Sequence, residues 1–539
     1  MSASDKKKLR AAERAEKLTE KQLTEQKEAK KLKIMTAIFA VVMALTICIA
    51  VVVGVTKTIE GSGSREKKTV ALTIGDQEIS NAELNYYYIN QVQNFANQYG
   101  DYLYMVGLDT TKPLNEQVIN EELGKTWADN FMDSAVENAK AVYTLCAAAE
   151  AEGFTLTEED NENIEAAIAT EEMYALYYYQ YPSLEDYLKA VYGFGATVES
   201  FREFYTMGYL ADAYQKHYID TLTYEDADLR EAEAADYLGY NSYSYNYYYL
   251  TTNNYVEAPE GTSAADYTAE QKAAAASKIE DIAKTLTAED ITSLEALDAA
   301  IAALPSNADV ANAASFASND MNYHSMNSIF ADWVADESRK AGDVEYFKQI
   351  NSDGEVTGIY VIMFNSATDN NFPLVNVRHV LVGFEGGTTD STTGTTVYSD
   401  VEKDAAHTEA MSILNEWKNG EATEDSFATL ANEKSDDGDG TTGGLYENVI
   451  PGQMVPNFND WIFDESRKAG DTGLVETEYG WHVMYFVGNS DVLYRDYMIE
   501  NDLKDADYTA WYEALMADVT ATIGDTKYIA TDLVLQPAK

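Results

Sequence analysis

Residues 460–471 read DWIFDESRKAGD, and residues 332–343 read DWVADESRKAGD. Ten of these twelve positions are identical at an offset of 128 residues. Chance does not give such agreement in a stretch of varied composition, and a fixed offset between similar segments indicates an internal repeat. The chain therefore contains a duplicated unit.

The sequence around each copy follows the same order of elements. A strand pattern opens the first copy at residues 242–250 (SYSYNYYYL) and the second at residues 377–382 (VRHVLV). Helical patterns follow in both, and each copy closes with an apolar strand, at residues 358–364 (GIYVIMF) and 481–486 (WHVMYF). This order predicts two α+β units in tandem.

Helical periodicity dominates the chain before the first copy, up to about residue 240. Residues 70–74 begin a short hairpin, and four residues of the types that cap helix N-termini precede helical patterns. These residues are Ser80, Thr157, Ser183 and Thr197. After the second copy the helical pattern returns, and residues 531–535 (TDLVL) predict a final short strand.

Charge is distributed unevenly along the 539 residues. The formal net charge is −53, from 38 Lys and Arg against 91 Asp and Glu, whereas residues 1–33 carry a net charge of +5. Phosphate backbones repel such a polyanion, so we exclude nucleic-acid binding. Two cysteines, Cys48 and Cys146, are too few for a disulfide framework or a cysteine-based zinc site, and we expect neither a metal nor a cofactor.

An uncharged run at residues 34–56 (IMTAIFAVVMALTICIAVVVGVT) follows the basic segment. As a helix it would span about 34 Å, enough for a bilayer core of about 30 Å. The preceding basic residues place the N-terminus in the cytoplasm. We predict a single-pass signal anchor in the cell membrane with the acidic bulk outside. Cleavage as a signal peptide and lipidation at Cys48 remain alternatives.

Four further motifs accompany the second copy in a fixed order, and together they carry a family resemblance. After VRHVLV come FATLANEKSDD at residues 427–437, GGL at 443–445, PGQMVPNF at 451–458 and VETEYGWHV at 475–483. This set resembles the parvulin-type peptidyl-prolyl cis-trans isomerases. The whole outer portion resembles the PrsA/SurA-type extracytoplasmic foldases.

The resemblance implies an α+β multidomain chain with an N-terminal transmembrane helix and a helical SurA-N-like chaperone domain that the C-terminal helix completes. Two tandem parvulin-like domains follow, of which the first is degenerate. The expected segments are a basic cytoplasmic segment 1–33, a transmembrane signal anchor 34–56, a linker 57–68, a helical chaperone domain 69–240 with 490–539, a degenerate parvulin-like domain 241–368 and a parvulin isomerase domain 374–489.

The resemblance also assigns site residues in the second copy. The expected polar, catalytic set is His379, Asp437, Thr477 and His482. The expected substrate-binding set is Leu445, Gln453, Met454 and Phe458. An X-Pro bond rotates over a barrier of about 18–20 kcal/mol without any bond being broken. An apolar pocket for the proline ring and polar groups beside the carbonyl need only favour the twisted amide.

The first copy lacks both histidines. Alignment of the strands places Tyr247 at the position of His379 and Tyr360 at that of His482, although Met326 and Phe330 match Met454 and Phe458. We therefore expect the first copy to be inactive or weak.

The resulting hypothesis is a membrane-anchored prolyl isomerase and chaperone for unfolded or newly secreted polypeptides that contain X-Pro bonds. A non-catalytic peptide-binding chaperone is the main alternative, and a surface adhesin is a third. The oligomeric state stays open, with a homodimer among the possibilities.

Overall fold

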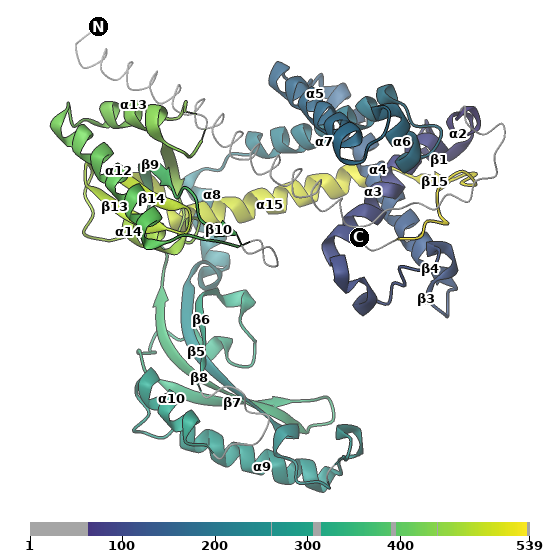
Figure 1. Ribbon diagram of the computed structural model, residues 1–539. Helices are drawn as coiled ribbons and strands as arrows, with labels where there is room; N and C mark the ends of the chain where they lie inside the picture. Colours follow the sequence, from purple (N-terminus) through teal and green to yellow (C-terminus); the bar gives the residue numbers. More distant parts are fainter. Residues whose placement is uncertain (1–62, 260, 305–313, 390–394, 439, 536–539) are drawn as a thin grey trace. The chain divides into compact units, whose positions relative to one another are not determined.

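The computed structural model describes residues 63–259, 261–304, 314–389, 395–438 and 440–535 (Figure 1). The chain divides into two compact units, Met1–Thr223 with Lys504–Lys539, and Tyr224–Leu503. The predicted basic segment and signal anchor, residues 1–56, lie outside the described residues. Among the residues that the structure does describe, none of the helices combines the length and the apolar character needed to cross a bilayer.

The first unit is mainly helical. Its helices are α2 (Ser64–Lys68), α3 (Asn81–Tyr99), η2 (Gly100–Val106), η3 (Leu114–Glu116), α4 (Trp127–Glu152), α5 (Glu158–Met173), the π-helix η4 (Tyr174–Tyr178), α6 (Leu184–Tyr192) and α7 (Val198–Thr221). Its strands are β1 (Val70–Ile74), β2 (Gln77–Ser80), β3 (Val118–Asn120), β4 (Lys125–Thr126) and β15 (Ala521–Ile523). The four predicted caps are confirmed, because each side chain accepts a backbone N–H bond in the first turn of its helix.

The C-terminal part of the chain returns to this unit. Helix α15 (Tyr494–Ala517) places Trp511 against Tyr218 of α7, with ring centroids 4.1 Å apart. Strand β15 then pairs antiparallel with β1. The predicted strand at residues 531–535 is wrong: this segment forms no ladder, and Leu533 and Leu535 are instead buried in the helical core. Here the alternating apolar residues are buried in the core without pairing as a strand. The sequence pattern alone does not distinguish these two cases.

The second unit contains two four-stranded antiparallel sheets with the same strand order. The first sheet, β6-β5-β8-β7, consists of β5 (Ser242–Thr251), β6 (Phe316–Asn322), β7 (Val344–Ile350) and β8 (Val356–Thr368). The second sheet, β12-β9-β14-β13, consists of β9 (Pro373–Gly383), β12 (Leu445–Val449), β13 (Thr472–Thr477) and β14 (Gly480–Leu493). When the strands are numbered in chain order within each four-stranded sheet, both sheets have the order 2-1-4-3, so the sequence repeat corresponds to a repeated topology.

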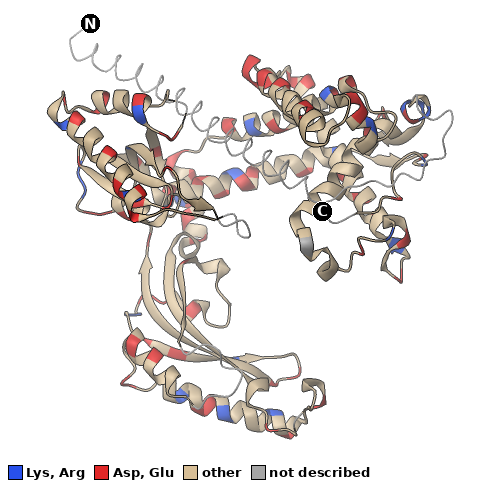
Figure 2. Ribbon diagram, viewed as in Figure 1, with Lys and Arg blue, Asp and Glu red and all other residues tan. Residues whose placement is uncertain are grey.

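Helices cover both faces of each sheet. The helices of the first copy are α9 (Ala269–Leu286), α10 (Leu294–Ala302) and α11 (Ala331–Val334), and those of the second are α12 (Asp400–Asn419), α13 (Glu424–Lys434) and α14 (Pro456–Ile462). In each copy the first two helices share one apolar cluster with the sheet, and the third helix packs on the opposite face. Figure 2 shows acidic residues on the helices of both units, whereas β5 and β8 carry no charged residue.

The twelve-residue repeat forms the same turn in both copies, between the third helix and the third strand. In the second copy, Asp464 Oδ1 accepts the amide proton of Ser466 at 2.9 Å, and the Arg467 guanidinium lies 3.9 Å from the centre of the Trp461 ring. Gly470 has a φ of 92°, which favours glycine. The equivalent residues of the first copy are Asp336, Ser338, Arg339, Trp333 and Gly342. The strongest sequence identity therefore has a structural origin.

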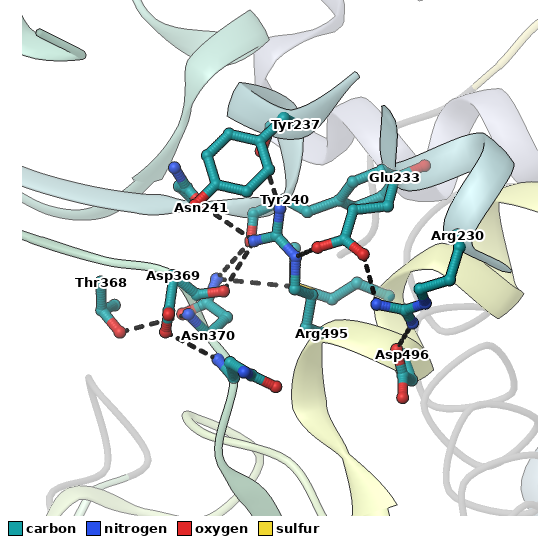
Figure 3. Close-up of polar contacts among 12 residues, drawn as sticks. Arg230, Glu233, Tyr237, Tyr240, Asn241, Thr368, Asp369, Asn370, Arg495 and Asp496 are labelled. Atoms are coloured by element: carbon teal, nitrogen blue, oxygen red, sulfur yellow. Dashed lines mark hydrogen bonds and ion pairs between the residues drawn. The ribbon is translucent and has the colours of Figure 1, made fainter. Parts of the chain in front are cut away.

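A buried arginine joins three segments of the second unit (Figure 3). Arg495, at the start of α15, is 2% exposed, and its Nε donates to Glu233 of α8 (Asp226–Ala235) at 2.5 Å. Its other donors bond oxygen atoms of Tyr237, Tyr240, Asn241 and Asp369. Tyr237, Tyr240 and Asn241 directly precede the first sheet, and Asp369 lies in the connection between the two sheets. The Arg495 side chain, at the start of α15, therefore connects the segment before the first sheet with the connection between the two sheets.

Candidate active site

Two histidines face each other on the α14 side of the second sheet. His379 lies in the central strand β9 opposite Met484, and His482 lies in β14 opposite Leu381. Side chains alternate between the faces of a sheet, so this register places both imidazoles on one face. They are 3% and 5% exposed, and their Nδ1 atoms are 3.0 Å apart.

A continuous hydrogen-bonded chain runs through the two imidazoles. His379 Nε2 lies 3.0 Å from Asp437 Oδ2, and His482 Nε2 lies 2.8 Å from Thr477 Oγ1. The backbone N–H of Tyr479 donates to Thr477 Oγ1 at 3.2 Å. Residues from three separate segments are thus connected in the order Asp437, His379, His482 and Thr477.

The charge states of Asp437 and His482 limit the directions that these bonds can take. The hydrogen bond from His379 lowers the pKa of Asp437, so its carboxylate is ionised at neutral pH and only accepts. Burial, together with the nearby His379, lowers the pKa of His482 to about 3. With one proton on each ring, His379 Nε2 donates to Asp437, His482 Nδ1 donates to His379 Nδ1, and the Thr477 hydroxyl donates to His482.

An apolar floor lies against the imidazoles. The ring of Phe458, from α14, makes edge contacts with His379 and His482 at centroid distances of 5.4 and 5.3 Å. Phe458 is buried, and the partly buried Met454 packs against the same cluster. The site thus combines a half-exposed carboxylate, whose side chain is 34% exposed, with two buried imidazoles and an apolar surface.

Two predicted binding residues lie elsewhere. Leu445 pairs with Arg378 in the register, so its side chain is on the face of the sheet opposite His379. Gln453 is exposed, and its Oε1 accepts the Ile450 N–H at 3.1 Å within its own turn.

The sequence interpretation missed Tyr446, which occupies the site face that was assigned to Leu445. Tyr446 pairs with Val377, two residues from His379 on the same face, and its hydroxyl donates to Asp437 Oδ2 at 3.1 Å. Its place on this face follows from the pairing of β12 with β9, which the sequence pattern alone does not show.

The first copy carries an aromatic group at the corresponding position. Tyr247 lies opposite Ile362 and Tyr360 opposite Tyr249, which reproduces the register of His379 and His482. Tyr360 packs on Tyr249 and Phe330, with ring centroids 4.4 and 5.5 Å away. The apolar floor is thus present, and aromatic packing occupies the place of the imidazole pair.

No cluster of three or more His, Cys, Asp or Glu side chains within the described residues is arranged to hold a metal ion. In the second copy the His379 and His482 ring nitrogens are engaged with one another, with Asp437 and with Thr477.

Comparison with known protein families gives two matches. Residues 360–488 match the PPIC-type PPIase domain, and residues 16–137 match the SurA-like N-terminal domain. The first range contains the whole candidate site. No curated protein is significantly similar to the chain.

Several solved structures are similar to parts of the chain. The PPIase domain of TbPAR42 is 25% identical, over 21% of this chain and 98% of that chain, with a TM-score of 0.17. PrsA from Bacillus anthracis is 19% identical over 28% of this chain and 59% of that chain, also with a TM-score of 0.17. Foldase protein PrsA from Lactococcus lactis is 13% identical over 56% of this chain and 78% of that chain, with a TM-score of 0.16. These scores add nothing to the two family matches.

Proposed function

The chain carries a PPIC-type peptidyl-prolyl isomerase domain at residues 360–488 and a SurA-like N-terminal domain at residues 16–137, and from this premise we propose that it is a membrane-anchored, extracytoplasmic isomerase and chaperone for secreted proteins. The observation that supports catalysis is the chain of hydrogen bonds from Asp437 to Thr477 beside the Phe458 floor. The expected clients are unfolded polypeptides that contain X-Pro bonds.

Catalysis by this site is non-covalent. The proline ring rests on Phe458 and Met454 while the preceding carbonyl swings past Asp437 and the imidazoles. Amide resonance is lost at the twisted state, so the enzyme needs only to bind that state more tightly than either planar form. A preference of about 3–4 kcal/mol for the twisted amide accelerates rotation by about 10²–10³-fold.

Charge near the site favours neutral or basic clients. The loop at residues 383–400, which follows β9, contains no Lys or Arg, and the chain beyond residue 33 carries 27 basic and 85 acidic residues. Such a surface repels phosphorylated and acidic peptides and attracts basic ones. Peptides with Lys or Arg before the proline are therefore expected to have lower KM values than peptides with Glu, and the difference should shrink in high salt.

The direct experiment measures isomerisation of an Ala-Pro peptide and proline-limited refolding with the full chain. His379→Ala combined with His482→Ala should lower the catalysed rate by at least tenfold. His324→Ala is a matched control, because that histidine lies in the first copy, is exposed and bonds Asp236. An unchanged rate in the double variant would show that the assignment of the site is wrong.

A second function, holding unfolded clients without catalysis, is favoured by exposed apolar side chains in the helical unit. The most exposed are Tyr104 at 71%, Leu123 at 77% and Tyr177 at 81%. Contact with an unfolded client would remove such side chains from water, which is favourable. This function predicts that suppression of client aggregation survives the double histidine substitution. Aggregation suppression that disappears with catalysis would argue against it.

A further inference from the structure

The side chain of Tyr446 belongs to the site on geometric grounds. Its ring centroid is 5.3 Å from that of His379, and the ring packs against the same apolar cluster as Met454. Tyr446 thus contacts both the apolar cluster and the His379 imidazole. Its position in β12 is fixed by ladder pairing with β9, so the ring is carried by the sheet rather than by a loop.

The hydroxyl of Tyr446 shares its acceptor with His379. Asp437 Oδ2 receives the Tyr446 O–H at 3.1 Å and the His379 Nε2–H at 3.0 Å. Asp437 itself lies in the connection between α13 and β12, next to Gly438, whose φ is 84°. Two donors fixed by two strands therefore hold a carboxylate that belongs to a non-regular segment.

We infer that Tyr446 is a positioning residue for isomerisation, which orients the Asp437 carboxylate through its hydroxyl and thereby fixes the His379 ring. This inference rests on the proposed function. With only His379 as a partner, the half-exposed carboxylate could rotate toward water, and the imidazole chain would lose its anchored end. A charge-assisted hydrogen bond from a rigid phenol restricts that rotation.

The consequence for kinetics is specific. Tyr446→Phe keeps the ring against the floor and removes only the hydroxyl, so peptide binding should persist while the polar chain loses its alignment. We expect kcat to fall about tenfold, which corresponds to about 1.4 kcal/mol, with KM unchanged within about twofold. Tyr485→Phe is the matched control, because Tyr485 lies on the opposite face of the same sheet, packed against Trp417 and Phe427, and its kcat should stay at the wild-type value.

A double-mutant cycle separates positioning from general damage to the fold. In the Asp437→Ala background the hydroxyl has no carboxylate to orient, so adding Tyr446→Phe should change kcat by less than about twofold. Full additivity of the two losses would overturn the inference, and so would a kcat for Tyr446→Phe equal to that of the wild type.

A spectroscopic readout keeps the inference distinct from the proposed function. In full-length protein labelled with ¹⁵N-histidine, the Nε2–H resonance of His379 should shift or broaden in Tyr446→Phe and remain in place in Tyr485→Phe. A wild-type chain without isomerase activity would refute the proposed function, whereas an unmoved His379 resonance would refute the role of Tyr446. If Tyr446→Phe unfolds the domain, Tyr446→Trp, which keeps a buried ring but cannot place a hydroxyl there, must show the same shift.

Discussion

Acidification from pH 7 to pH 5 should destabilise the isomerase domain through His482. Burial and the neighbouring His379 lower the pKa of this imidazole from 6.5 to about 3 in the folded chain. A group whose folded pKa is depressed binds more protons when unfolded, so stability rises with pH between about 3 and 6.5. At pH 5 the imidazole of the unfolded chain is almost fully protonated, whereas that of the folded chain is neutral. This difference lowers the free energy of unfolding by about 2 kcal/mol relative to pH 7.

Asp437 does not obscure this window. The bond from His379 holds its folded pKa below the ordinary value of 3.8, so the stability that it contributes is lost only as the pH falls further, below that value. Between pH 5 and pH 7 its carboxylate is ionised in both states.

The assay is hydrogen exchange of the β14 peptide, residues 480–493, combined with urea unfolding at pH 5, 6 and 7. The comparison is with His482→Gln, which removes the titrating group. The wild type should lose about 2 kcal/mol more than the variant between pH 7 and pH 5. Equal losses in both proteins would refute the argument that buried neutral His482 sets the acid sensitivity.

Three further predictions concern the fold and the anchor. Arg495→Met should lower the free energy of unfolding of the second unit by about 3 kcal/mol, because the oxygen atoms of Tyr237, Tyr240, Asn241 and Asp369 lose their donor. Glu233→Gln should cost less, because Glu233 is also paired with Arg230, and urea unfolding of both variants measures the difference. Gly342→Ala should destabilise the protein more than Gly470→Ala does, as measured by thermal unfolding. A Cβ at Gly342 would lie 2.2 Å from a main-chain oxygen, whereas a Cβ at Gly470 meets nothing within 4 Å. Equal losses of stability would contradict this reasoning. Deletion of residues 1–56 should release the protein from membranes in a sedimentation assay and leave the isomerisation rate unchanged.

Local rules predicted much of the architecture. The four helix caps and the first hairpin depend on neighbouring residues, and the repeat was visible as sequence identity. The strand assignments at residues 377–382 and 481–486 were correct but short, because each strand continues past its apolar run. Long-range pairing decided the rest: β15 lies at residues 521–523 because β1 offers its edge there, a partner more than 400 residues away in sequence.

The site was predictable from motifs only to the level of segments. The motifs identified His379, His482, Asp437 and Thr477, which the structure brings together. They did not settle which residue of the Leu445–Val449 strand faces the imidazoles, because that depends on the ladder with β9. Nor did they reveal Arg495, whose partners lie about 126 to 262 positions away and carry no common pattern.

The comparison of the two copies separates the requirements of the fold from those of the chemistry. The ten identical residues form a turn whose contacts are needed to connect the third helix to the third strand, and both copies retain them. The positions of the imidazoles are unconstrained by that turn, and in the first copy they hold Tyr247 and Tyr360, whose rings pack against Phe316 and Tyr249 rather than against each other. The residues that are identical in the two copies therefore indicate what the fold requires. Whether a copy can catalyse the reaction depends on the few strand positions whose side chains face the third helix.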